Sequence, residues 1–448
     1  YGAAFLFGIT SPSFADRGTG YNYNAGSSWN PNVTARIETA RAGTPSLVYT
    51  AGGTEAVISH VTSGTGVLRI NRRSTKGSGA WTESLIPSNT NRTLLWPRAA
   101  SGGANGNTIH CIAITTPVFN SGSTYQGVDG ALLYYRSTDE GATWDVIDYL
   151  DQALSSSNFL RTRADSYSIF SRGDNVAIAV FNQMADVIIL KSSDNGLTWT
   201  SQIVNDFPVD LYQIDQGIDL NGDLEADTLE TSDESGAIMI DYNGMVHLTF
   251  GRMLVRDADL TDNEWTFFPQ TPELLYWNES MGVGNFTTIA TPEDVNNNGL
   301  VDDAGDIGRY KTGLCSQSSI GINADGTLFV VYSGHREDLY TNTQNFRHIY
   351  ALKSMDGGNS WTQPIDLTPD LQQVGYEAVY PNITPTVNDR IRLTYMRDLE
   401  PGLAVLGEDP YAMNQIMYLD NDTLLTSSVG IEESISLSEG VQLYPNPS

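Results

Sequence analysis

Short apolar runs separated by polar, glycine-rich turns make up most of this 448-residue chain. The runs at 131–135, 187–190 and 349–352 are typical, and each is followed one residue later by a turn that begins with Ser. Short apolar runs bounded by turn residues predict β-strands, because a helix needs a longer pattern with a period of 3.6 residues. The chain is therefore expected to be all-β.

An eight-residue pattern, Ser-x-Asp-x-Gly-x-x-Trp, follows each of these three runs. Ser and Asp can accept hydrogen bonds from nearby backbone N–H groups, Gly can adopt a positive φ, and Trp can cover the turn. Each copy is expected to be a structural hairpin turn with a buried Trp, and weaker copies lie at 22–29 and 74–81. The three full copies consist of Ser137, Asp139, Gly141 and Trp144; Ser192, Asp194, Gly196 and Trp199; and Ser354, Asp356, Gly358 and Trp361.

The pattern resembles the Asp box of the sialidase-type (BNR-repeat) β-propellers, in which a box joins the third and fourth strands of a blade. Repeats about 40 to 60 residues apart are typical of radial repeat folds. The resemblance implies a six-bladed, all-β, sialidase-like propeller over residues 1–429, with no box in blades four and six. The N-terminal stretch 18–37 contains a weak box, so we expect it to supply outer strands that close the last blade.

The charge balance limits the classes of partner. The chain has 24 Lys and Arg against 53 Asp and Glu, which gives a net charge of −29. A field of this sign repels nucleic acid and anionic lipid, and it suits either solubility outside the cell or binding of divalent cations. No apolar run is long enough for a membrane span. Cys111 and Cys315 are expected to be buried free thiols.

The end of the chain differs in composition from the rest. Residues 430–441 are polar and are interpreted as a linker. Residues 442–448 end in Leu443-Tyr444-Pro445-Asn446-Pro447, which resembles the beginning of the C-terminal sorting domain of type IX secretion cargo; a Pro-rich linker end is the alternative. The resemblance implies export by the type IX secretion machinery, followed by release or attachment at the outer surface of a Gram-negative bacterium.

Two acidic loops are candidate calcium sites. Ca²⁺ binds six to eight oxygen ligands, and alternate positions of a tightly turned loop can supply them. The first loop has Gly299 at the turn and resembles the calcium loops of dockerins, although Gly305 stands where a bidentate acid is usual. The second loop has Leu224 in place of the glycine, and whether it binds a metal is left open. The candidate ligands are Asp294, Asn296, Asn298, Leu300 and Asp302 in the first loop, and Asp219, Asn221, Asp223 and Asp227 in the second.

Four arginines are candidate ligand-binding residues. The resemblance places the connections that enter each blade on one face, here called the top face, with the box turns on the opposite, bottom face. Sialidases hold a substrate carboxylate there with three arginines, whose planar guanidinium groups suit bidentate pairing. Rim charges paired with nearby carboxylates are the alternative interpretation. The candidates are Arg98, Arg252, Arg336 and Arg397.

Catalysis is weakly indicated. The Arg-Ile-Pro motif of sialidases is missing, and Glu377 with Tyr380 is the nearest match to the Tyr nucleophile and its Glu. We therefore expect a non-catalytic, secreted or cell-surface propeller that is stabilised by Ca²⁺ and binds glycan or a protein partner through its top face. An exo-acting sialidase-type glycoside hydrolase is the alternative hypothesis.

Overall fold

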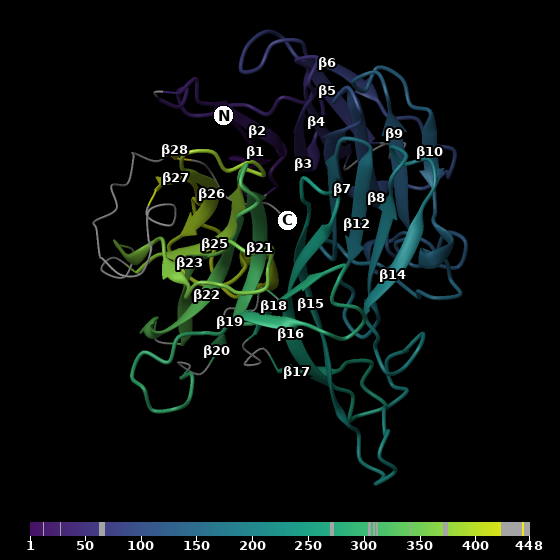
Figure 1. Cartoon of the computed structure of the whole chain (residues 1–448), viewed down its shortest axis with the longest axis vertical. Coiled ribbons are helices and arrows are strands. Elements are labelled where there is room, and N and C mark those ends of the chain that lie inside the picture. The colour runs from purple at the N-terminus through teal and green to yellow at the C-terminus, as the bar shows by residue number, and fades with distance from the viewer. Residues whose placement is uncertain are drawn as a thin grey trace.

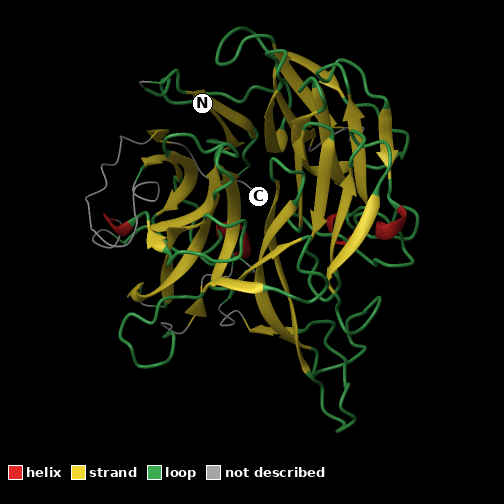
Figure 2. Cartoon of the chain, viewed as in Figure 1, coloured by secondary structure: helices red, strands yellow, loops and turns green. Residues whose placement is uncertain are grey.

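The described part of the chain forms six β-sheets of four or five strands, arranged as a ring of blades, and a separate two-stranded sheet, as the computed structural model of Figure 1 shows. The structure describes all residues except 12, 27, 62–67, 269–272, 303–305, 308–309, 311, 342, 371–374, 423–440 and 443–448. Strands dominate, and the helices in the described part are three-residue turns at Val118–Asn120, Gln152–Leu154 and Ala404–Leu406 (Figure 2). The predicted six-bladed, all-β propeller is confirmed.

The first three blades are regular four-stranded antiparallel sheets. Their strands follow one another in sequence order from the inside of the ring outward, so each blade is a simple meander. The strands are β3 (Ala42–Tyr49), β4 (Glu55–Val61), β5 (Leu68–Arg73) and β6 (Thr82–Leu85); β7 (Leu94–Gly102), β8 (Thr108–Thr115), β9 (Leu132–Ser137) and β10 (Val146–Tyr149); and β11 (Tyr167–Arg172), β12 (Asn175–Val180), β13 (Val187–Ser192) and β14 (Thr200–Asn205).

Blades four and five carry longer second strands, β16 and β22. In blade four β16 also pairs with the short strand β17, and in blade five the short strand β20 pairs with the third strand, β23. The strands are β15 (Thr228–Ile240), β16 (Val246–Arg256), β17 (Thr266–Phe268), β18 (Leu274–Asn278) and β19 (Thr287–Ala290); β20 (Asp306–Ile307), β21 (Cys315–Ile322), β22 (Leu328–Tyr340), β23 (Gln344–Ser354) and β24 (Ile365–Asp366); and β25 (Glu377–Ile383), β26 (Ile391–Asp398), β27 (Gln415–Asn421) and β28 (Val441–Gln442).

The core lies between adjacent blades. Every residue of β4 and β8 is buried, because the middle of a blade is covered on both faces by its neighbours. Ile58 and Ile70 of blade one, for example, share a cluster with Ile109 and Tyr135 of blade two. Cys111 and Cys315 are buried and free, as expected. Within the described part, no helix has the length and apolar character needed to cross a membrane.

The N-terminal strands close the ring by packing, not by joining a blade. Strands β1 (Gly2–Phe7) and β2 (Gly18–Tyr23) pair with each other as a separate sheet, and they lie between blades six and one in Figure 1. Phe5 and Phe7 pack with Ile416 of blade six. The fourth strand of blade six is β28 instead. The prediction that the N-terminal strands add to the sheet of blade six is therefore wrong. These strands contact blade six through side chains instead. The rest of the predicted linker and the sorting sequence, 430–440 and 443–448, lie outside the described residues.

The three box turns share one hydrogen-bond pattern. The Ser hydroxyl accepts the Gly N–H at 2.8 Å, and the Asp carboxylate accepts an N–H two residues beyond the Gly at 2.8–2.9 Å. Hydrogen bonds from the Ser360 hydroxyl and backbone lower the pKa of Asp356 to about 2. The expected full burial of the tryptophans is wrong. Trp144, Trp199 and Trp361 are half-buried, since each indole lies across the edge between two blades.

A box also fastens its blade to the preceding one. Trp361 of blade five contacts the ring of Tyr276 in blade four edge-on, with ring centroids 5.0 Å apart. The Tyr276 hydroxyl is held by His247 at 2.7 Å and by Asn278 at 3.0 Å. Blades two and three repeat this arrangement with His110, Tyr134 and Trp199. The box therefore stabilises the ring as well as its own hairpin.

Candidate functional site

The inner strands carry backbone strain at one level of the ring. Five of them contain a register shift, near the first residues of β3, β7, β21 and β25 and in the middle of the longer β15, and a non-glycine residue with a positive φ lies within each shift. In blade three the equivalent residue stands two positions before β11. A left-handed backbone costs such residues about 1 kcal/mol or more, and strain of this kind clusters at functional sites. The six residues are Thr44, Trp96, Asp165, Glu234, Gln317 and Tyr380, with φ between 45° and 66°.

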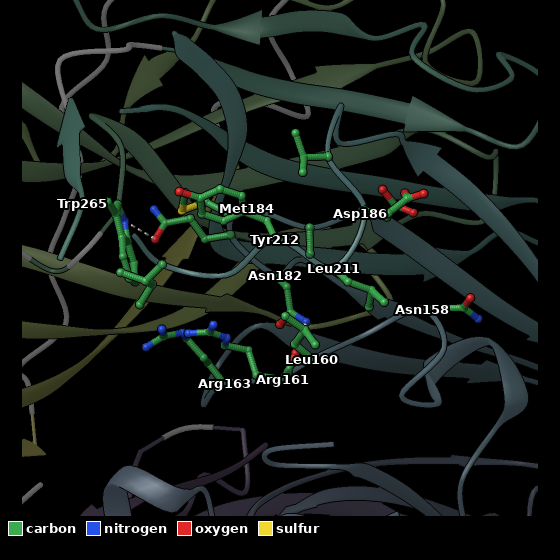
Figure 3. Close-up of a pocket in the computed structure, with 15 residues that line it drawn as sticks. Asn158, Leu160, Arg161, Arg163, Asn182, Met184, Asp186, Leu211, Tyr212 and Trp265 are labelled. Carbon is green, nitrogen blue, oxygen red and sulfur yellow. Dashed lines mark hydrogen bonds between the residues drawn. The ribbon is translucent and has the colours of Figure 1, made fainter. Parts of the chain in front are cut away.

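A pocket opens on the top face beside this strained level (Figure 3). It is formed by four connections: 158–163 before blade three, 182–186 within it, 209–214 before blade four, and Trp265 within blade four. The space between its walls, counted together with the open solvent at its mouth, is about 570 Å³.

One wall of the pocket combines an indole with two guanidinium groups. The Trp265 N–H donates to Gln183 Oε1 at 3.2 Å, and the Arg163 guanidinium lies 5.5 Å from the Trp265 ring centroid. Arg163 also forms an ion pair of 3.4 Å with Glu234, one of the strained inner-strand residues. Figure 3 shows Arg161 next to Arg163 on the same side of the pocket. This ion pair connects the wall to the inner strand of blade four at the centre of the top face.

The two arginines differ in their partners. Within the described part of the chain, no acidic side chain lies within ion-pair distance of Arg161, which is half-buried. Burial and the neighbouring Arg163 lower the pKa of Arg161, although an arginine stays charged at neutral pH. Figure 3 shows Asp186 on the opposite side, and Asp210, which also lines the pocket, is near enough to act on its charge; burial raises the pKa of Asp186. The pocket is therefore positive at one end and negative at the other.

A small core beneath the pocket holds its shape. Met184, Phe207, Tyr212, Ile218 and Val255 are buried together. The connection that contains Tyr212 is tied to blade four, because its hydroxyl and the Asp215 N–H both donate to Asp257. This connection thus lies against a packed surface.

The four arginines expected to bind a ligand all have partners within the protein. Arg98 pairs with Asp165, and Arg252 with Glu230 and Glu273. Arg336 pairs with Asp338 at 2.8 Å and Asp366 at 3.2 Å, and Arg397 donates to Gln415 Oε1 at 2.8 Å. They belong to blades two, four, five and six. A part in ligand binding stays a prediction, and a ligand would have to displace these partners.

Glu377 and Tyr380 do not form a hydrogen-bonded pair in the structure. Glu377 is fully buried, accepts the backbone N–H of Arg347, and has a pKa raised to about 8 by burial. Tyr380 is 41 % exposed, and its ring meets that of Tyr310 edge-on at 5.9 Å. The two side chains, three residues apart on β25, point into different environments. The carboxyl is therefore protonated at neutral pH and the phenol is accessible from the top face.

The first acidic loop is a tight turn held by its own side chains. Asp294 accepts the N–H groups of Asn298 at 3.2 Å and Gly299 at 2.7 Å, and the Asn296 and Asn298 amides donate to Asp302 at 2.8 and 3.2 Å. Glu337 of β22 accepts two further backbone N–H groups of the loop. Glu337 was not expected from the sequence, because it lies 35 residues beyond Asp302.

The second acidic loop repeats this conformation. Asp219 accepts the N–H groups of Gly222 at 2.6 Å and Leu224 at 3.0 Å, and Asn221 donates to Asp227 at 3.1 Å. Leu224 has a φ of 70°, where Gly299 of the first loop has 89°. The missing glycine therefore does not change the turn, and Leu224 adopts the strained backbone with its side chain in solvent.

The pocket residues could have been suspected from two features of the sequence. Trp265 belongs to no box and, unlike Trp277, is not fully buried. Arg161 and Arg163 stand two residues apart in a chain that is poor in basic residues. Neither feature shows that the two segments meet, because about 100 residues separate them and the fold brings them together.

The sequence matches no family model and no curated protein. Among solved structures, the Hadza microbial sialidase Hz136 is 16% identical, with 80% of this chain and 63% of that chain covered and a TM-score of 0.37. A polysaccharide lyase, PL25 ulvan lyase, is 11% identical, with 86% and 82% covered and a TM-score of 0.47. The six-bladed β-propeller lectin of Aleuria aurantia is 10% identical, with 89% and 94% covered and a TM-score of 0.36. These likenesses are distant, and none carries an argument about the ligand of this chain.

Proposed function

We propose that this protein is a non-catalytic, secreted or outer-surface propeller that binds glycan through the pocket of its top face. The observation that carries the proposal is the wall built from Trp265, Gln183 and Arg163. A flat indole offers an apolar surface to the C–H face of a sugar ring, and neighbouring amide and guanidinium groups can bond its hydroxyls. A concave site of this kind suits a small ligand such as a sugar better than the flat surface of a protein partner does.

Substitution of the indole tests the proposal. Trp265→Ala is expected to weaken binding of a pocket-binding oligosaccharide by about tenfold or more, because loss of one well-placed aromatic contact costs more than 1 kcal/mol. Titration calorimetry against a panel of neutral and acidic oligosaccharides measures the effect. The control is Tyr242→Ala, which removes an exposed aromatic side chain from a bottom-face turn. Equal affinity of the Trp265 variant and the unmodified protein would contradict the proposal.

A hydrolase is the second candidate, and one observation favours it. Tyr380 is exposed, strained and close enough to Asp165 across the top face for their charges to interact. An exo-acting sialidase-type enzyme needs a phenol nucleophile, a Glu that accepts its proton, and an Asp acid–base; Tyr380 and Asp165 would supply the first and the last, whereas buried Glu377, with a raised pKa, does not suit the role of the Glu. This candidate requires turnover of a sialoside that Tyr380→Phe abolishes. The binding proposal predicts that the sialoside remains intact.

We also propose that Ca²⁺ stabilises the loop at 294–302. The side-chain amides of Asn296 and Asn298 donate to Asp302, so their partly positive N–H groups occupy the position that a cation would take. Rotation of these amides would turn their oxygens toward a bound cation. Asp294, Asn296, Asn298, Asp302 and the Leu300 carbonyl would supply the ligands. Within the described residues, no three acidic, His or Cys side chains converge as a metal site, so the loop depends on its amide and carbonyl oxygens. The loop at 219–227 is a second candidate with the same conformation.

Removal of calcium is expected to lower the melting temperature. A cation that binds only the folded state stabilises it by about 2.7 kcal/mol at a hundredfold excess over Kd. Differential scanning calorimetry in Ca²⁺ and in excess chelator measures the shift, and Asp294→Asn should reduce it. A melting temperature that is equal in both buffers would refute the calcium proposal.

Export by the type IX secretion machinery of a Gram-negative bacterium is part of the same proposal. Its support is the sequence Leu443-Tyr444-Pro445-Asn446-Pro447 alone. A location outside the cell agrees with the strongly acidic composition, which favours solubility.

A further inference from the structure

The pocket keeps two adjacent arginines in a protein that is otherwise rich in carboxylates. With 53 acidic residues, the chain supplies carboxylate partners to arginines elsewhere, such as Arg136, Arg336 and Arg392. Within the described residues Arg161 forms no ion pair, as is also true of Arg172 and Arg397, but Arg161 alone of these three lines the pocket, where it lies beside another arginine. The nearest carboxylates that act on its charge, Asp129 and Glu234, do so over a longer distance.

This arrangement costs energy in the free protein. Burial disfavours the charge of Arg161, and repulsion from Arg163 adds to that cost. Arg163 is only partly compensated, by Glu234 at 3.4 Å. An anion that enters the pocket would reduce both the cost of burying the Arg161 charge and its repulsion from Arg163, because two guanidinium groups can share one planar group of oxygens. A neutral sugar would leave them unrelieved.

We propose that the pocket selects an acidic sugar, whose carboxylate or sulfate group lies between Arg161 and Arg163 while its ring lies against Trp265. This rests on the glycan-binding function proposed above and names the class of its ligand. The far wall limits the choice further, because Asp186 and Asp210 repel a second anionic group. The ligand is therefore an acidic residue next to a neutral one, or at the end of a chain, and not a densely charged polyanion.

Matched oligosaccharides test the proposal. The probes are a trisaccharide that ends in glucuronic acid, the same trisaccharide with its carboxylate reduced to a hydroxymethyl group, and the reduced form carrying one sulfate ester. Calorimetry at 0.15 M salt should show at least one anionic probe binding about tenfold or more tightly than the reduced one. Comparison of the two anionic probes distinguishes carboxylate from sulfate as the recognised group.

Arginine variants connect the preference to the pocket. Arg161→Gln and Arg163→Gln should each remove most of the preference for the anionic probe, and Arg256→Gln, on the same face but outside the pocket lining, should keep it. Equal melting temperatures show that the variants are folded. If all three probes bind equally and Trp265→Ala weakens them equally, the acidic-sugar inference fails while the glycan-binding function stands. If none binds, both fail.

Discussion

Gly358→Ala is expected to lower the free energy of unfolding by about 3 kcal/mol, because the new methyl group meets both strain and a clash. Gly358 has a φ of 94°, and a Cβ at this position would lie 2.0 Å from the Tyr276 hydroxyl oxygen. That tyrosine cannot move away easily, since His247, Asn278 and the Gly357 carbonyl hold its hydroxyl. The clash lies at the junction of blades four and five, so the variant weakens the ring and not the turn alone.

The same turn offers the control. Gly357 has a φ of 70°, and a Cβ there would have nothing within 4 Å. Gly357→Ala is therefore expected to cost only the backbone strain, about 1 kcal/mol. Chemical denaturation of both variants measures the difference. Equal losses of stability would contradict the view that the box fastens one blade to the next.

The effect of Glu377→Gln on the free energy of unfolding is expected to be more stabilising at pH 8 than at pH 5, by an amount on the order of 3 kcal/mol. Burial raises the pKa of Glu377 from 4.5 to about 8, and each unit corresponds to about 1.4 kcal/mol. Between pH 4.5 and about pH 8 the folded state holds a proton that the unfolded state has lost, so the free energy of unfolding falls as the pH rises through this window. Glutamine has no proton to lose and still offers an oxygen to the Arg347 N–H.

Denaturation of both proteins at pH 5 and pH 8 measures this difference. Glu264→Gln, at an exposed position, serves as the control and should give the same result as the unmodified protein at both values. If Glu377→Gln destabilises the protein equally at both pH values, the carboxyl is ionised in the folded state, which would contradict the raised pKa of Glu377.

The fold could be predicted because its signals are local. Each box contains its own turn chemistry, so the Ser354, Asp356 and Gly358 pattern indicates a hairpin without knowledge of the rest of the chain. The closure of the ring is harder to predict from the sequence. The sequence at 18–37 indicates strands, but whether they join blade six or pack beside it depends on Phe5, Phe7 and Ile416, which meet only in the folded ring.

The candidate site could be predicted only in part, because its residues come from separate blades. The sequence places Arg98 and Arg252 near the ends of strands on the top face, but it does not show that Asp165, Glu230 and Glu273 on the same face pair with them. The acidic loops can be recognised in the sequence, because their oxygens are close together in the chain. The pocket cannot, because four connections that are distant in the sequence form it.

A crystal structure with a bound acidic oligosaccharide tests the central claim most directly. The account predicts a sugar ring against the Trp265 indole, with its anionic group between Arg161 and Arg163 and its hydroxyls facing the wall that carries Asp186. Calorimetry on the same preparation establishes that the ligand is bound in solution. A ligand seated over Tyr380 at the centre of the top face, or on the face of the box turns, with the Trp265 pocket left open, would contradict it.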